Sequence, residues 1–195
     1  MDITFNTGLM GAGKSKKLID DYLMETKEKV ALSVSLTEDT FSRGKIESRD
    51  GRSLKSINLN KDQFEQNISL LEAIIFMTNT QTIFIDESQF LPKETIEKFV
   101  SLSQVCHVPI HFYGLDLTFT GELFDSSNYL LTILPSKNII RVSRKCEAPQ
   151  CFKEAEYNAR IVDGKVSRSG ETFVKEKSNY LALCSDHYYN NEKII

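Results

Sequence analysis

Several features are scarce or missing in this sequence, and each absence narrows the class of protein. The 195 residues include no tryptophan and only four prolines, and basic residues do not outnumber acidic ones, since the formal net charge is −3. That balance gives no sign of a surface for nucleic acid or for a membrane. No apolar run approaches the length of a transmembrane helix, and the N-terminus lacks the basic and apolar segments of a signal peptide. We therefore expect a cytoplasmic protein with neither nucleic acid nor membrane as a partner.

Cysteine is also scarce. Four cysteines in a chain without a secretory signal predict reduced thiols or a metal site rather than disulfides. The length suits one ordinary domain, large enough for a sizeable core, with a small satellite.

The stretch that organises the chain fits the phosphate-loop pattern G-x-x-x-x-G-K-[ST]. It consists of Gly8, Leu9, Met10, Gly11, Ala12, Gly13, Lys14 and Ser15. Residues 2–6 before it alternate as in a buried strand, and residues 16–29 after it lack proline and glycine and carry apolar residues at helical spacing. A strand, a glycine-rich loop and a helix are the context that the motif requires.

The chemistry of this loop favours a nucleotide site over a simple glycine-rich turn that caps a helix. Glycines let the backbone approach phosphate closely, and the amides at the helix start point at the anion. Lys14 is expected to reach the outer phosphates, and the Ser15 hydroxyl is expected to ligate Mg²⁺.

A second motif lies about seventy residues further on. The apolar segment 81–85 ends in Asp86 and Glu87, and Ser88 and Gln89 follow. An acid at such a strand end typically holds Mg²⁺, and a neighbouring acid can accept a proton from an attacking hydroxyl. The alternative is an acidic cap for the helix expected over residues 93–104.

The remaining pattern predicts a parallel α/β sheet with flanking helices. Further core strands are expected over residues 30–36, 108–115 and 139–142, a helix over 62–77, and a short helix near 129–131. The polar segment 37–56 is expected to be a functional or mobile loop, or else a disordered insertion. The loop 116–124 carries Phe119 and Phe124, which form either a satellite core or a flat face for a ring-shaped substrate.

The C-terminal part has the spacing of a structural zinc ribbon. The ligands are expected to be Cys146, Cys151, Cys184 and His187, in two pairs that flank a hairpin with its turn at Asp163-Gly164. Buried free thiols are the alternative. Cys106, His107 and His111 lack spaced partners and are expected to be structural.

The ordered set of motifs resembles the type II thymidine kinase family over nearly the whole chain, from Ile3 to about Tyr189. The resemblance is closest to the bacterial and phage branch, through residues 44–49. The residues that carry it are the phosphate loop, Asp86-Glu87-Ser88-Gln89-Phe90, Tyr113-Gly114-Leu115, Gly121-Glu122-Leu123-Phe124 and the paired zinc ligands.

The resemblance implies phosphoryl transfer from ATP to the 5′-hydroxyl of thymidine. ATP would be bound by residues 8–15 and 86–89, with Mg²⁺ on Ser15 and Asp86, and Glu87 matches the catalytic base of the family. The Ser48-Arg49 loop would be a flexible lid near the donor. The nucleoside would be bound by Leu115, Phe119, Phe124, Phe173, Val174, Lys175 and Tyr180, the last four from a segment called the lasso, whose two ends the zinc ties down. The family is usually tetrameric and inhibited by thymidine triphosphate.

Two stretches depart from the family pattern. Asp39-Thr40-Phe41 stands where the family commonly has Asp-x-Arg at the phosphate site, a place that Arg43 could fill. The lasso lacks its usual glycine at Phe173-Val174-Lys175-Glu176, which leaves open a deoxynucleoside kinase of altered base specificity.

Two hypotheses from other classes compete with a nucleoside kinase. Asp86 to Gln89 also resembles the acidic box of helicase-like ATPases, although the chain is short for two motor lobes and is acidic. The other hypothesis is a zinc-ribbon binding module with a vestigial nucleotide site. Against it, the ribbon lacks the basic face that binding to nucleic acid would need. We expect a P-loop α/β domain over residues 1–143 and a zinc-and-lasso domain over residues 144–195.

Overall fold

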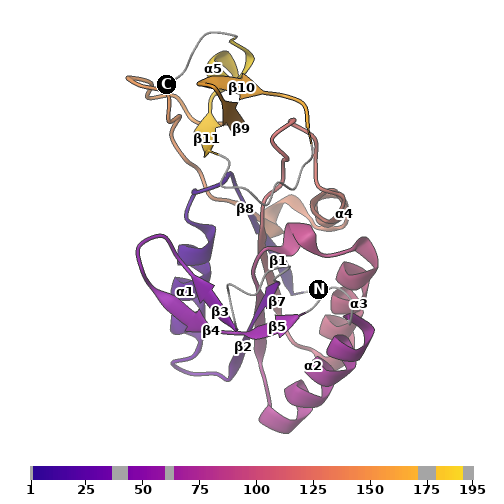
Figure 1. Cartoon of the computed structure of the whole chain (residues 1–195). Helices are drawn as coiled ribbons and strands as arrows, with labels where there is room; N and C mark the ends of the chain where they lie inside the picture. The colour runs from indigo at the N-terminus through magenta and orange to yellow at the C-terminus, as the bar shows by residue number, and fades with distance from the viewer. Residues whose placement is uncertain (1, 37–43, 60–63, 171–178, 191–195) are drawn as a thin grey trace.

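A six-stranded parallel sheet forms the centre of the molecule (Figure 1). The computed structural model describes residues 2–36, 44–59, 64–170 and 179–190. The strands lie in the order β5 (Ile57–Leu59), β2 (Ala31–Leu36), β6 (Thr82–Ile85), β7 (Ile110–Gly114), β1 (Ile3–Thr7) and β8 (Ile139–Arg141).

Helices cover both faces of this sheet, which explains the nearly continuous apolar runs of its strands. On one face, α1 (Lys14–Glu25) packs Leu18 and Ile19 against Phe84 and Tyr113. On the other face, a larger cluster joins the sheet to α2 (Phe64–Thr78) and α3 (Lys93–Cys106). A shorter helix, α4 (Asp125–Ile133), packs beside α3.

The strand order brings the two nucleotide motifs together. The phosphate loop follows β1 and the acidic pair follows β6, and only β7 lies between these two strands. Because the strands are parallel, their carboxyl ends meet at one edge of the sheet, where ligands of open α/β folds bind.

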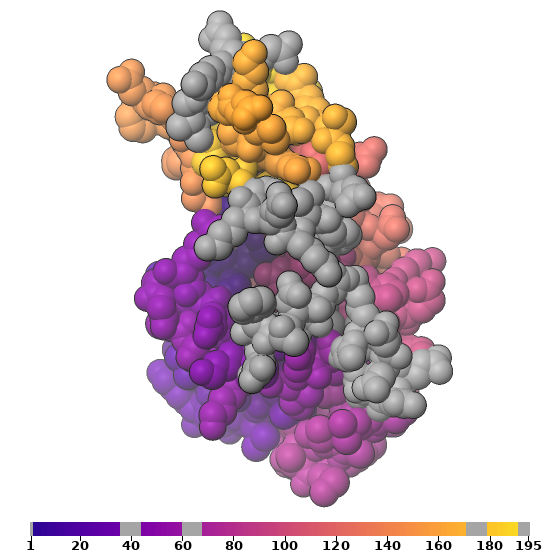
Figure 2. Space-filling model, in the orientation of Figure 1, coloured from indigo at the N-terminus to yellow at the C-terminus, as the bar shows by residue number. Residues whose placement is uncertain are grey.

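A small antiparallel unit follows β8. Its sheet has the order β10 (Lys165–Ser167), β9 (Tyr157–Val162) and β11 (Asn179–Leu183), and α5 (Ser185–Tyr189) completes it. Asp163 and Gly164, both with positive φ, form the two-residue turn that the sequence predicts. Figure 2 shows this unit, in orange and yellow, at one end of the α/β body.

The structure confirms the α/β fold class, with a parallel sheet and flanking helices, and it corrects several local expectations. Residues 37–56 are not simply a loop, because β3 (Lys45–Glu47) and β4 (Ser53–Lys55) form a hairpin within them. The strands β5 and β11 and the helix α5 were not predicted. The first helix ends at Glu25 rather than Lys29, and the N–H groups of Lys27 and Glu28 bond to carbonyls three residues back instead of four. The described residues contain no helix with the length and apolarity to cross a bilayer.

Cys106, His107 and His111, which were predicted to be structural, take part in packing, in a helix end and in a hydrogen bond between strands. Cys106 packs at the margin of the larger cluster. His107 ends α3 with a left-handed backbone. The His111 ring bonds to the Thr4 hydroxyl at 2.8 Å, and burial lowers the pKa of this histidine.

Candidate active site and metal centre

The phosphate loop has the backbone geometry that its glycines permit. Gly11 and Gly13 have φ of 69° and 93°, a region that residues with side chains rarely adopt. A side chain on Gly8 would lie 2.4 Å from the carbonyl oxygen of Val142, so the loop passes directly against the end of β8. Gly13 caps α1, whose first amides therefore face the space above the loop.

The lysine of the motif lies within the loop. Lys14 Nζ donates to the carbonyls of Gly8 at 3.0 Å and Leu9 at 2.9 Å. Burial lowers the pKa of Lys14, while Glu87 and Asp86 act in the opposite direction. Its cation is therefore little hydrated and lies close to both acids of the second motif.

Asp86 lies behind the loop with an exposed fraction of 6 %. Burial raises the pKa of Asp86, and the neighbouring Glu87 carboxylate raises it further, whereas hydrogen bonds from the Glu87 backbone and the Ser15 hydroxyl lower it. The contact between Ser15 and Asp86 is the arrangement expected of two oxygen donors that bind one divalent cation.

Glu87 has an unusual backbone and a firmly positioned side chain. Its φ of 54° and ψ of 36° are left-handed, a conformation that non-glycine residues adopt mostly at turns and functional sites. Gln89 Nε2 donates to Glu87 Oε2 at 2.5 Å, and Gln89 Oε1 accepts the backbone N–H of Leu115 at 3.0 Å. The buried amide of Gln89 thus fixes the Glu87 carboxylate relative to the end of β7.

A cavity of about 530 Å³ opens above these residues. Its volume lies within the range of small-molecule sites. The lining of the cavity includes many of the residues predicted to bind ATP. These are Met10, Gly11, Gly13, Lys14, Ser15, Glu87 and Gln89. Gly8, Leu9, Ala12 and Asp86 do not line the cavity, and Ser88 is fully buried with its hydroxyl facing Gly114.

Of the residues predicted to bind the nucleoside, the described ones are Leu115, Phe119 and Phe124 of the loop 115–124 and Tyr180 of β11. Leu115 lines the cavity, and Phe124 lies edge-on to Phe90, which lines it too. Phe119 is 3 % exposed and packs against Tyr180 of β11 and the guanidinium of Arg160. Phe119 therefore joins the loop to the small unit. Phe173, Val174 and Lys175 lie outside the described residues, as do Phe41 and Arg43.

The small unit also contacts the phosphate loop directly, through both backbone groups of Met10. The Met10 N–H donates to Asn158 Oδ1 at 2.7 Å, and the Met10 carbonyl accepts from Arg144 Nη1 at 2.6 Å. Asn158, which is 2 % exposed, donates through Nδ2 to the Leu117 carbonyl at 2.8 Å. One buried amide from β9 thus joins the phosphate loop to the loop 115–124.

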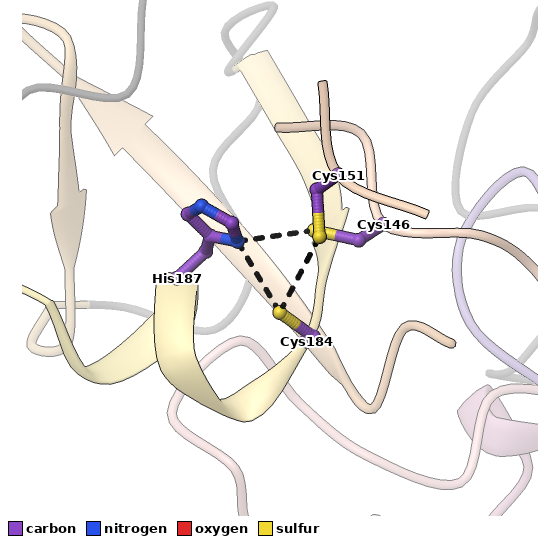
Figure 3. Close-up of side chains that lie close together, drawn as sticks. All are labelled: Cys146, Cys151, Cys184 and His187. Atoms are coloured by element: carbon purple, nitrogen blue, oxygen red, sulfur yellow. Dashed lines mark hydrogen bonds between the residues drawn. The ribbon is translucent and has the colours of Figure 1, made fainter. Parts of the chain in front are cut away.

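Four side chains in the small unit form a candidate metal centre (Figure 3). The donor atoms of Cys146, Cys151, Cys184 and His187 all lie within 4.8 Å of one another. The Cys184 Sγ is 3.2 Å from His187 Nδ1 and 3.9 Å from Cys151 Sγ. Sulfur ligands of a tetrahedral zinc ion, each about 2.3 Å from the metal, lie about 3.8 Å apart, so this donor set fits zinc.

The sequence identified every residue of this centre. The backbone N–H of Lys153 lowers the pKa of the Cys151 thiol, which favours the thiolate that binds metal, whereas burial raises the pKa of Cys146. Four protein donors leave no open position for a catalytic water, so the centre has the composition of a structural site.

Several residues around the cavity escaped the sequence analysis. Lys16, Glu47, Asp50 and Phe90 line it but were not assigned as ligands, although Glu47 and Phe90 lie in stretches that carry the family resemblance. Asn158 and Arg144 lie more than 130 positions from Met10 along the chain, and no local pattern links them.

Comparison with known proteins identifies the family. The sequence matches the family described as "Thymidine kinase" over residues 1–188. The chain belongs to the thymidine kinase family. This membership confirms the resemblance inferred from the motifs and decides against a helicase-like ATPase and a zinc-ribbon module.

Named relatives of the thymidine kinase family cover the chain almost completely. The thymidine kinase of Bacillus subtilis subsp. natto is 86 % identical over 195 residues, which is all of both chains. The thymidine kinase of Photobacterium profundum is 30 % identical over 94 % of each chain. That of Salmonella typhimurium is 31 % identical over 94 % of this chain and 88 % of its own.

Proposed function

We propose that this thymidine kinase family member transfers the γ-phosphoryl group of ATP to the 5′-hydroxyl of thymidine, yielding dTMP. The observation that carries the proposal is one cavity lined by both the phosphate loop and Glu87, a carboxylate fixed by a buried amide. Donor phosphates and an acceptor hydroxyl have to meet in such a space for direct transfer.

The donor binds at the start of α1. The free amides of the first helical turn and the cation of Lys14 bind the phosphates. Ser15 and Asp86 would hold the Mg²⁺ that accompanies ATP, and the bound ion would neutralise charge on the phosphates.

Glu87 acts as the general base. The 5′-hydroxyl must lose its proton as its oxygen bonds to the γ-phosphorus, and the bond from that phosphorus to the β–γ bridging oxygen breaks. Glu87 accepts the proton, and the electron pair of the broken bond leaves on ADP. Gln89 positions the carboxylate throughout, because its amide binds both Glu87 and the backbone of Leu115.

The nucleoside binds between the loop 115–124 and the small unit. Leu115 and Phe124 contact the base from the α/β side, and Phe119 and Tyr180 close the site from the other side. We assign Phe173, Val174 and Lys175 to the same site on the resemblance alone. Zinc on the four-residue centre anchors this unit and takes no part in the reaction.

A panel of deoxynucleosides tests the proposal. With ATP and Mg²⁺, thymidine should give the 5′-monophosphate at the highest kcat/KM, and Lys14→Ala should abolish the product while its melting temperature stays near wild type. Single-stranded DNA should not stimulate ATP turnover. Equal use of several deoxynucleosides would remove the assignment to thymidine, and full activity of Lys14→Ala would remove the phosphate site.

Further proposals concern the whole chain. We propose a boundary near residue 143 between the P-loop domain and the zinc-and-lasso domain, a cytoplasmic location and a homotetramer. The boundary is supported by separate apolar clusters on its two sides. Light scattering on the purified protein would measure the mass of the assembly.

A further inference from the structure

Arg49 lies in the turn of the β3–β4 hairpin, and its side chain points over the phosphate loop. It lines the same cavity as Lys14 and Glu87. Its Nη1 is 2.7 Å from the place that a side-chain carbon on Gly11 would take, so glycine at position 11 makes room for it. It is also close enough to Lys14 to lower the pKa of that lysine.

The turn that carries Arg49 is anchored to α1. The Ser48 N–H donates to the Arg52 carbonyl at 2.9 Å and the Gly51 N–H to the Ser48 carbonyl at 3.0 Å. Arg52 forms ion pairs with Asp50 in the turn and with Asp20 on α1. Beneath it, Ile46 is 2 % exposed and packs with apolar residues of α1. The position of Arg49 relative to the phosphate loop is therefore set by the fold.

The guanidinium of Arg49 differs from that of the neighbouring Arg144 in its bonding partners. Arg144 Nη1 approaches the same point above Gly11, but Arg144 is bound to the Met10 carbonyl and to Glu147. Within residues 2–36, 44–59, 64–170 and 179–190, no hydrogen bond or ion pair is found for the guanidinium of Arg49. Two guanidinium groups that converge on one point repel each other unless an anion binds there.

We propose that Arg49 binds the outer phosphates of the donor and is a catalytic residue of this kinase. The planar guanidinium offers two parallel N–H donors, a geometry that matches a phosphate edge. The inference rests on the proposed phosphoryl transfer and adds a charged contact from the hairpin to it.

The role of Arg49 follows from where charge develops. As the bond between the γ-phosphorus and the β–γ bridging oxygen breaks, negative charge grows on that oxygen, while the 5′-oxygen forms the new bond and its proton goes to Glu87. A cation fixed beside the outer phosphates stabilises this redistribution more than it stabilises bound ATP. Arg49 therefore contributes to the rate as well as to ATP affinity.

Calorimetric titration tests the contact without turnover. An ATP analogue with a nitrogen bridge between the β- and γ-phosphorus atoms, and separately ADP, would be titrated with Mg²⁺ into wild type, Arg49→Ala, Arg49→Lys and Lys45→Ala. Lys45 is an exposed cation on the same hairpin outside the cavity, so Lys45→Ala is the matched control for charge. Arg49→Ala should weaken binding of the analogue about tenfold more than it weakens binding of ADP, since a hydrogen bond between the charged guanidinium and the outermost phosphate is lost.

Single-turnover kinetics with thymidine complete the test. Arg49→Ala should be slower by about 10²–10³-fold, the usual cost of one electrostatic donor to a transition state, with Arg49→Lys in between and Lys45→Ala unchanged. Equal weakening of the analogue and ADP, or an Arg49→Ala rate within twofold of Lys45→Ala, would overturn the proposal. A wild-type protein without thymidine phosphorylation would instead refute the proposed function. Melting temperatures near wild type for all variants establish that the hairpin is intact.

Discussion

Glu87 combines a left-handed backbone with a side chain bound to Gln89, and this combination leads to a test of its role. We predict that Glu87→Gln lowers kcat by about 10²–10⁴-fold, because an amide cannot accept the proton of the 5′-hydroxyl. The KM for ATP should change little, since we assign donor binding to residues 8–15. Steady-state phosphorylation of thymidine measures both constants.

The control for this variant is its fold. Zinc content and melting temperature of Glu87→Gln should match wild type. The substitution keeps the size of the side chain and requires the same left-handed backbone. A folded variant with near-normal kcat and an unchanged single-turnover rate would show that another group accepts the proton.

Asp86 predicts a pH dependence of stability. Its pKa rises in the folded state from the ordinary 3.8 to about 7, chiefly through burial, so the folded protein keeps a proton that the unfolded chain has lost. Stability of the free enzyme therefore falls as pH rises from about 4 to about 7. Without added Mg²⁺, Asp86→Asn should lose less melting temperature between pH 5 and pH 8 than wild type loses. An equal loss in both proteins would show that Asp86 titrates normally.

At the scale of elements, length and the density of apolar residues together decided what the sequence could predict. The three-residue strand β8 was predicted from its apolar run, whereas the longer β11 was missed. The helices α2 and α3 span 15 and 14 residues, enough to show a repeat of apolar positions. The strands β3, β4 and β5 have three residues each, too few for an alternation to stand out, so tertiary pairing alone identifies them. The phosphate loop and the acidic pair were predicted because each is contiguous in sequence. Asn158 was not assigned a role, because its partners are distant in sequence. Arg49 was assigned only to a flexible lid near the donor, and no local pattern marked it as a phosphate ligand.

The strand β9 carries Asn158, whose side-chain amide joins the phosphate loop to the loop 115–124. Substitution of Asn158 therefore measures the contribution of this contact. We predict that Asn158→Ala raises the KM for ATP about tenfold and lowers the free energy of unfolding by about 2–4 kcal/mol, since two partly buried backbone groups lose their partner. Asn128→Ala, at an exposed position of α4, is the matched control. Initial rates and urea titration measure the two effects. An ATP KM equal to that of Asn128→Ala would show that the phosphate loop keeps its shape without the contact.

At the scale of the whole molecule, the candidate metal centre lies directly beside the strand that carries Tyr180 of the proposed nucleoside site. Cys184 follows β11 directly, and β11 carries Tyr180 against Phe119. We predict one zinc ion per chain, and removal of it should raise the KM for thymidine by about 10–100-fold. The KM for ATP should rise less, because Asn158 lies in β9, which β10 and β11 flank on both sides.

Elemental analysis and chelation check this prediction. Protein purified without chelator should contain zinc in a 1:1 ratio, and added Zn²⁺ should restore the thymidine KM of the chelated protein. Metal-free protein with an unchanged KM and melting temperature would show that the four side chains form an ordinary core.

The contact of Asn158 with Met10 and Leu117 also limits how the sequence can drift. Asn158 is 2 % exposed, and its position requires one hydrogen-bond acceptor and one donor at the end of a side chain of this length. Aspartate lacks the donor, leucine lacks both groups, and glutamine is longer by a methylene. A substitution at position 158 is therefore tolerated only with changes that supply new partners in the other two segments. In descendants of this sequence, the phosphate loop, the loop 115–124 and β9 should vary together at these positions or remain unchanged.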